Sequence, residues 1–490
     1  MKIRLLGALS AVLLLVALWM PSCRKEVYAT KGALSFSVDT LSFDTVFTSL
    51  GSTTRAFKVR NTQSKAVKIS SIKLLQQQGN QFRINVDGVS GTSFQDVEVL
   101  GKDSIYVFVE VTVNPNNTNN PLVLFDQIEF VTNGTTQQVV LEAYGQDAHY
   151  YRGKRIASGV VTLPNDKPVV ILSGDSFPGL EVGSAATLNI NAGTKIFMGP
   201  NALISVNGTL NCNGTLSDSI IFQGLRLEAS YAGKPGQWFG IVYGRNSTYG
   251  AKVNLTHTII DESYFGLSDE HILNIITSKR VTDSKIADYA TYAVVPVINL
   301  SKTIIRNCSS TSLTALRSTL TATNCLFHSA GGQMVIGALG GSYQFNHCTM
   351  ANVNNRYTDH KNESLTFSEY LTDIDDNLIG PGPLTANVIN CVVYGTLQTE
   401  LAFSPRNIAN VSFQNCLLRI AEDSFHLVQA ANNGCVFNKD PQFRRETEDN
   451  YQPDSTTSPL YRAGVSTSVT DDLHDALRSN PPDIGAIQWP

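Results

Sequence analysis

The chain has 490 residues, 42% of them apolar and 16% charged, and its net charge at neutral pH is −4. At about 100–200 residues per domain, this length allows roughly two to four domains with cores of ordinary size. With 37 Lys and Arg residues against 41 Asp and Glu residues, the chain has no excess of positive charge to neutralise phosphates, so nucleic acid is excluded as a partner.

The first 23 residues have the order of a secretory signal. Lys2 and Arg4 precede an apolar run, residues 5–20, that ends shortly before Cys23. This run is shorter than the roughly 20 residues that a membrane-spanning helix needs.

Because Cys23 stands at the expected cleavage point, the segment resembles a bacterial lipoprotein signal, in which this cysteine becomes the acylated first residue. The resemblance implies attachment to a membrane through an N-terminal lipid. It places the protein in the cell envelope of a Gram-negative bacterium, at the outer membrane or the cell surface. The alternative is ordinary secretion with an incidental cysteine.

Residues 30–148 predict an antiparallel β-sandwich. Apolar and polar residues alternate in short runs such as Phe57–Arg60 and Ile105–Val109, and turn signals such as Asn133-Gly134 separate the runs.

Part of this region is similar to the immunoglobulin-like domains related to the major sperm protein fold. The segments that carry the resemblance are Leu41–Val46, Val59–Asn61, Gly101–Ser104, Val113–Pro115 and Leu141–Gly145. That family contains spacer and protein-binding modules and transfers no catalytic residue, so the resemblance implies a stalk or docking domain.

An internal repeat organises residues 155–440. Leu188–Thr194 recurs as Leu210–Thr215, and a shorter pattern then returns at steps of 26, 19, 22, 23, 43 and 25 residues. Steps near 22 residues fit one coil of a parallel β-solenoid, whereas a propeller needs about 40–50 residues per repeat. The sequence therefore predicts an all-β protein in which a sandwich precedes a parallel solenoid.

The second residue of each short repeat predicts a single file of side chains along one interior corner. These residues are Thr258, Ser284, Thr303, Cys325, Cys348, Cys391 and Cys416. Asn324, Asn390 and Asn415 come one residue earlier, and asparagine accepts backbone conformations that most residues avoid. His257 and His347 are expected to replace asparagine in its hydrogen bonds rather than to bind a metal. Because stacked side chains point in parallel, we expect buried free thiols rather than disulfides.

The start of the solenoid resembles the first turns of right-handed parallel β-helices of the pectate-lyase type. The residues that carry this resemblance are Gly193–Ile196, Gly208–Leu210 and Gln237–Ile241. Asp440–Phe443 and Pro482–Ala486 match the closing segment of bacterial surface β-helix proteins. The resemblance implies a right-handed β-helix over 155–440 and a C-terminal cap over 441–490, which we expect to cover the strand edges of the last coil.

Enzymes that act on acidic polysaccharides need a base beside a neutralised carboxylate. The chain offers Asp269, Glu270, Lys279 and Arg280 in neighbouring turns as catalytic candidates. None of them lies in a lyase or polygalacturonase motif, and a solvated outer face is the simpler interpretation.

A polar excursion at about 354–383 interrupts the repeat and is a candidate for ligand contacts. Asp373, Asp375 and Asn377 in it have the spacing of the first oxygen ligands of a calcium loop. Leu378 stands where such a loop needs glycine, so an EF-hand is excluded and a looser calcium site remains.

Four aromatic or imidazole side chains are candidate ligand-binding residues. Tyr357 and His360 lie in the polar excursion, and Trp238 and Tyr243 lie near the first coils. The simpler interpretation of Trp238 and Tyr243 is packing in the core.

The leading hypothesis is a lipid-anchored β-helix protein that presents an extended surface and binds a polysaccharide or another envelope component. The first alternative is a polysaccharide lyase or glycoside hydrolase that acts on an acidic polysaccharide. The second is an adhesin with a protein partner.

Overall fold

The structure is a computed structural model, in which the chain divides into two compact units between Asp147 and Ala148. It describes residues 28–115, 122–245, 248–270, 294–353, 356–372, 378–379, 382–404, 410–421, 432–446 and 449–490. The predicted signal with Cys23 lies outside these residues. The described residues contain strands and turns but no α-helix, and therefore no helix of the kind that crosses a membrane.

The first unit is an antiparallel sandwich of two five-stranded sheets, which confirms the prediction. The first sheet has the order β1 (Ser35–Phe36), β3 (Arg55–Arg60), β8 (Ser104–Val111), β5 (Phe82–Val86), β6 (Val89–Gly91). The second has the order β2 (Thr40–Phe47), β10 (Thr135–Gln146), β9 (Leu122–Thr132), β4 (Val67–Leu74), β7 (Ser93–Val99). Only the pair of β2 and β10 is parallel among these described strands.

The sandwich core follows from the period-two pattern of its strands. In β8, Ile105, Val107 and Val109 are buried, whereas Tyr106 and Phe108 between them are exposed. A strand points alternate side chains to opposite faces, so one run of sequence supplies both the core and the outer surface.

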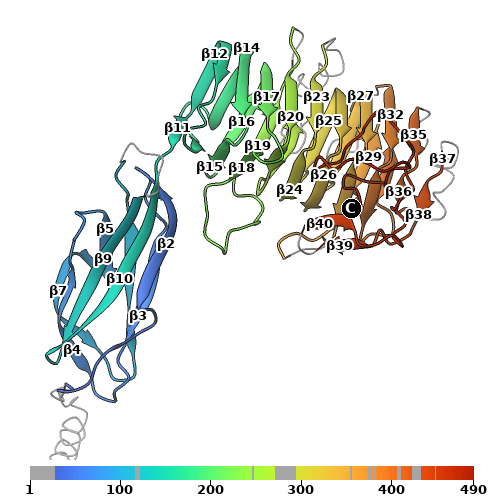
Figure 1. The fold of residues 1–490 in the computed structure, drawn as a ribbon. Helices are drawn as coiled ribbons and strands as arrows, with labels where there is room; N and C mark the ends of the chain where they lie inside the picture. The colour runs from blue at the N-terminus through green and yellow to red at the C-terminus, as the bar shows by residue number, and fades with distance from the viewer. Residues whose placement is uncertain are drawn as a thin grey trace, which may run out of the picture. The chain divides into compact units, whose positions relative to one another are not determined.

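The second unit contains two large sheets of parallel strands, and the chain passes from one sheet to the other as it advances (Figure 1). The eleven-stranded sheet contains β11 (His149–Arg152), β13 (Val169–Leu172), β15 (Lys195–Met198), β18 (Ile220–Gly224), β21 (Thr258–Ile260), β24 (Ile304–Cys308), β26 (Leu326–Ala330), β28 (Thr349–Asn352), β33 (Val392–Gly395), β36 (Leu417–Leu418) and β38 (Val436–Phe437).

The fifteen-stranded sheet contains β12 (Lys154–Thr162), β14 (Gly179–Asn191), β16 (Leu203–Val206), β17 (Thr209–Asn213), β19 (Gly240–Tyr243), β20 (Lys252–Thr256), β22 (Leu267–Asp269), β23 (Val297–Ser301), β25 (Leu313–Thr323), β27 (Val335–Asn346), β29 (Leu365–Ser368), β32 (Leu384–Ile389), β34 (Leu401–Ser404), β35 (Val411–Gln414) and β37 (Asn432–Asn433). Two antiparallel pairs stand apart, β30 (Leu371–Thr372) with β31 (Leu378–Ile379), and β39 (Phe443–Arg445) with β40 (Asn450–Pro453).

The fifteen-stranded sheet consists of two ladders, because its long strands pair with different neighbours along their two halves. The first half of β14 pairs with β16, and the second half pairs with β17. We call the ladder that runs through β14, β17, β20, β23, β25, β27, β32 and β35 the second ladder. Most coils thus contribute one strand to the eleven-stranded sheet and strand segments to both ladders.

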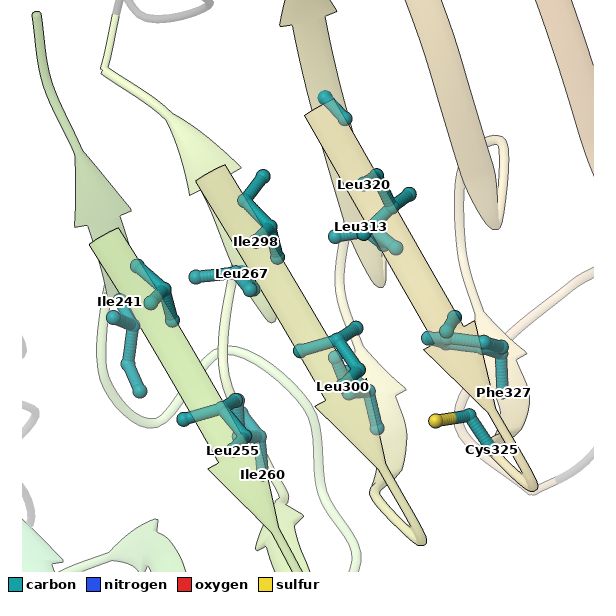
Figure 2. Packing of buried hydrophobic residues seen from close by; sticks show 14 of the residues in the cluster. Ile241, Leu255, Ile260, Leu267, Ile298, Leu300, Leu313, Leu320, Cys325 and Phe327 are labelled. Atoms are coloured by element: carbon teal, nitrogen blue, oxygen red, sulfur yellow. The ribbon is translucent and has the colours of Figure 1, made fainter. Parts of the chain in front are cut away.

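The core of this unit is a stack of equivalent apolar residues from successive coils. Leu255 pairs with Leu300 in the next coil, and Ile298 pairs with Leu320. Figure 2 shows these side chains pointing into the interior together with Ile260 and Phe327 from the facing sheet. Like residues therefore meet like residues along the axis, which accounts for the steps near 22 residues in the sequence.

The predicted corner is present in the described coils. Asn324, His347, Asn390 and Asn415 have φ of 53°, 52°, 53° and 47°, a left-handed conformation that asparagine tolerates. Each precedes a buried cysteine, and the backbone N–H of Cys348 donates to Cys391 Sγ at 3.3 Å in the next coil. Thr258 and Thr303 occupy the same file, whereas Ser284 lies outside the described residues. The seven described cysteines are free, as expected.

The C-terminal segment, residues 441–490, departs from the expected cap. It packs along the outer face of the eleven-stranded sheet, where Leu473 and Ala486 meet Leu326, and Leu460 and Ile484 meet Val392. A cap over the last strand edge would contact only the final coil. This segment instead covers several coils, because the outer residues of their strands are apolar and need to be shielded from water.

The C-terminal segment also binds the left-handed corner. Asn390 Nδ2 donates to Val465 O at 2.8 Å, and Val465 N donates to Asn390 Oδ1 at 2.8 Å. Asn415 Nδ2 donates to Ala463 O at 2.9 Å. Asn390 Nδ2 also lies 2.9 Å from His347 Nε2. Burial lowers the pKa of His347 to about 3, so its neutral ring can accept this bond as expected for a residue in the asparagine column.

We predict that Asn390→Ala lowers the free energy of unfolding of the second unit by about 1–3 kcal/mol, because it leaves the partly buried backbone N–H and C=O groups of Val465 without this partner. The measurement is denaturant unfolding followed by the fluorescence of Trp238 and Trp489. The control is Asn213→Ala on an exposed strand position. Equal stabilities of the two variants would contradict the role of the corner.

Candidate functional site

The outer side of the second ladder is a continuous polar surface. Alternate residues of its strands point away from the core, as the burial pattern of β17 illustrates. We call these outward residues the polar face: Thr187, Asn189, Asn191, Thr209, Asn211, Asn213, Lys252, Asn254, Thr256, Val297, Asn299, Ser301, Thr319, Thr321, Thr323, Ser342, Gln344, Asn346, Thr385, Asn387, Ile389, Ser412 and Gln414.

A ladder of asparagine amides runs along the polar face. Asn211 Nδ2 donates to Asn189 Oδ1 at 2.9 Å, and Asn254 Nδ2 donates to Asn211 Oδ1 at 2.8 Å. Asn299 Nδ2 continues the ladder to Asn254 Oδ1 at 2.8 Å. These bonds fix the orientation of each amide.

The polar face has hydrogen-bonding capacity but almost no charge. An asparagine amide has two N–H groups and two acceptor lone pairs, and each step of the ladder uses one N–H and one lone pair. Lys252 is the only charged member of the polar face. Successive coils repeat this arrangement at about 4.8 Å. The surface can therefore form hydrogen bonds with an uncharged, hydroxyl-rich polymer along several coils.

A second cluster of polar groups lies where the chain leaves the eleven-stranded sheet. Asp261 accepts hydrogen bonds from Arg306 Nε at 2.7 Å and from Asn307 Nδ2 at 2.8 Å. Glu262 accepts from Gly233 N at 2.7 Å and from Gly224 N at 3.1 Å. Glu262 thereby holds the loop 225–237 against the next coil.

Glu262 is the carboxyl group in this cluster whose proton affinity is altered most clearly. Burial, and then the charge of Asp261, raise the pKa of Glu262 to about 7. Such a pKa suits a general acid. However, Glu262 is only 7% exposed, and both of its oxygens accept backbone hydrogen bonds. The geometry therefore favours a role in positioning the loop.

A pair of stacked aromatic rings flanks the same loop. The rings of Phe239 and Tyr264 belong to successive coils, with centroids 6.0 Å apart and planes inclined by 20°. Tyr264 is 43% exposed, so it offers a ring surface to a ligand. Neither residue stands out in the sequence, because the two rings come from different coils and share no motif.

Trp238 and Tyr243, the two aromatic candidates near the first coils, are core residues. They are 1% and 0% exposed. Trp238 Nε1 donates to Asp261 O at 2.8 Å, and the Tyr243 hydroxyl donates to Thr314 O at 2.8 Å. Neither ring presents a face on which a sugar could stack.

Tyr357 and His360 do not converge on an open site. The Tyr357 hydroxyl donates to Ser230 O at 3.4 Å, which links the polar excursion to the loop 225–237. His360 Nε2 lies 2.8 Å from Glu400 Oε2, and both side chains are fully buried. This pair fastens the excursion to the coil and is closed to ligands.

The catalytic candidates are only partly described. Asp269 is fully buried, whereas Glu270 is partly exposed. Lys279 and Arg280 lie outside the described residues, so a catalytic role of these four candidates is not tested.

The calcium candidates Asp373, Asp375 and Asn377 also lie outside the described residues. Within the part of the chain that the structure describes, no group of three or more His, Cys, Asp or Glu side chains is placed to hold a metal ion.

Comparisons with known proteins identify no family. No protein-family model matches the chain, and no curated protein matches it. Among solved structures, the chain is similar to the catalytic unit of a GH87 alpha-1,3-glucanase from Streptomyces thermodiastaticus, with 8% identity over 74% of this chain and 79% of that chain and a TM-score of 0.25.

Two further likenesses are more local. A family 123 glycoside hydrolase from Clostridium perfringens shows 8% identity over 23% of this chain and 25% of that chain, with a TM-score of 0.17. The E. coli chaperone DraB shows 8% identity over 24% of this chain and 55% of that chain, with a TM-score of 0.17. The chain thus spans only a quarter of the length of that hydrolase. TM-scores this low carry no argument about fold or function.

We predict that the contribution of Glu262 to the stability of the second unit falls as the pH rises from 4.5 to 7, whereas the buried His347 contributes in the opposite sense. The pKa of Glu262 is about 7 in the folded protein against 4.5 for a free glutamate, so the unfolded chain loses this proton at lower pH than the folded one. Thermal unfolding across this range should therefore show that the stability of the natural chain, relative to that of Glu262→Gln, decreases as the pH rises. Glu363→Gln is the control, and an unchanged slope in Glu262→Gln would contradict the assignment.

Proposed function

We propose that the protein is a cell-envelope lipoprotein that binds a neutral polysaccharide along its second unit. In this proposal, residues 155–440 form a right-handed parallel β-helix that serves as a rigid support. In chain order, the sandwich comes after the lipid-carrying Cys23 and before this support. The observation that carries the proposal is the polar face, an array made mostly of amides and hydroxyls, with the single charge of Lys252, repeated along successive coils.

The chemistry of the polar face favours a neutral polymer over an acidic one. A polyanion gains affinity from cations on its binding surface, and the polar face has only Lys252. A neutral polysaccharide supplies hydroxyl groups at regular intervals, and these groups both donate and accept hydrogen bonds. The amides of Asn254 and Asn299 are held in register for such contacts.

We predict that Asn299→Lys together with Thr321→Lys reduces the affinity for a neutral polysaccharide roughly tenfold or more, because bound polymer would cover unpaired charges. Both positions are exposed and pair with each other across adjacent coils. The measurement is binding of the full chain to an array of neutral and uronate polysaccharides in the presence of EDTA. Thr136→Lys on the exposed end of β10 is the matched control.

Two outcomes of this experiment would overturn the proposal. The first is binding that is unaffected by the two lysines. The second is release of oligosaccharide products from the panel, which would indicate a hydrolase or a lyase. If product release also disappeared in Glu262→Gln, Glu262 would become the candidate general acid.

We predict that the protein partitions into the detergent phase of a Triton X-114 extract and that Cys23→Ser moves it to the aqueous phase. A lipid on Cys23 adds buried hydrocarbon worth about 0.8 kcal/mol per methylene group. Cys435→Ser serves as the control because it removes another thiol. Aqueous partition of the natural chain would refute the anchor without affecting the polar face.

A further inference from the structure

A cavity of about 550 Å³ lies between the eleven-stranded sheet and the start of the C-terminal segment. Tyr394 and Arg419 line it from the coils, and Asp440, Arg444 and Glu446 line it from the opposite side. It is separate from the polar face, which belongs to the other sheet. Its lining is rich in charge, whereas the polar face is almost uncharged.

The arginines of this cavity are held by aromatic rings. The guanidinium of Arg419 lies 5.2 Å from the centroid of the Tyr394 ring, and that of Arg444 lies 5.5 Å from the centroid of the Trp489 ring. At these distances each guanidinium is attracted to the electrons of the ring, and its remaining N–H donors can bind an anionic group. Within the described residues, neither arginine forms an ion pair with a carboxylate.

Two carboxylates share the cavity with these arginines. Burial, and then the charge of Asp440, raise the pKa of Glu446, which shows that the two groups sense each other. Neither carboxylate is paired with Arg419 or Arg444 among the described residues. Carboxylate oxygens at such positions can accept hydrogen bonds from hydroxyl groups.

The binding surface continues beyond this cavity. A neighbouring cavity of about 540 Å³ is lined by Arg444, Arg445, Asn450 and Asp454. Arg444 and Arg445 therefore line both cavities. A ligand longer than one sugar residue could place an anionic group beside the arginines and extend in either direction.

We propose that this pair of cavities binds a glycan that carries an anionic substituent on its sugars. Arg419 and Arg444 hold the anionic group through charge-assisted hydrogen bonds, and Asp440 and Glu446 accept bonds from the sugar hydroxyls. A free inorganic anion would use only the arginines. A neutral glycan would leave the positive charge of the arginines uncompensated. This site is additional to the polar face and does not depend on it.

The test is isothermal titration of the full chain with four probes: a uronate oligosaccharide, a sulfated oligosaccharide, a neutral oligosaccharide and sodium sulfate. We expect at least one of the two anionic oligosaccharides to bind, and the comparison identifies carboxylate or sulfate as the preferred group. Arg419→Gln with Arg444→Gln should weaken that binding roughly tenfold or more. Glu446→Gln should weaken binding of the anionic oligosaccharide, because Glu446 contacts its hydroxyl groups. It should not weaken binding of sodium sulfate.

The controls separate binding from folding. Arg226→Gln changes an arginine that also stacks on an aromatic ring, Tyr231, but lies outside both cavities. Thermal unfolding of every variant shows whether the second unit remains folded. The proposal is overturned if neither anionic oligosaccharide binds, if sodium sulfate binds as tightly as the oligosaccharide, or if the folded double variant keeps full affinity. The lysine variant of the polar face should leave this binding unchanged, so the two proposals fail independently.

Discussion

The second unit depends on the left-handed corner at which each coil enters the eleven-stranded sheet. A residue with positive φ turns the chain at the same point in successive coils, as at Asn324, Asn390 and Asn415. A small buried residue, cysteine or threonine, follows the left-handed residue. Its small size lets the same position stack from coil to coil without steric overlap. If one coil shifted by a single residue, its strand would turn its apolar side chains outward. The corner therefore maintains the register on which the core and both outer surfaces depend.

The two sheets of this unit have different outer surfaces. Because the register is the same in successive coils, residues of one kind repeat along the outside of each sheet. Outward residues of the eleven-stranded sheet include Leu326, Val392 and Leu417, and the C-terminal segment shields them from water. Outward residues of the second ladder are mostly amides and hydroxyls and need no cover. The chain thus uses its last 50 residues to protect one side and leaves the other side available for a ligand.

The two proposed sites suit different ligand chemistries. The polar face has fixed amides and a single lysine, which favours a neutral polymer that forms many similar hydrogen bonds. The cavity beside Arg419 and Arg444 has concentrated charge of both signs, which favours an anionic group on a sugar. The buried thiols of the corner serve neither site. Burial raises the pKa of Cys325 and Cys391, so these thiols are neutral and act as small packing groups.

The sequence by itself determined the sandwich, the parallel coils and the corner file, because period-two alternation and a repeat near 22 residues are local signals. It also contained half of the asparagine ladder in the recurrence of Asn189 and Asn211, although Asn254 and Asn299 continue the ladder at larger steps that hide it. Only the tertiary structure decided that Trp238 and His360 are enclosed, that the C-terminal segment lies along the coils, and that Arg419 meets Arg444 across a cavity. These contacts depend on how individual side chains and the C-terminal segment pack against the coils, and a repeat pattern does not specify that packing.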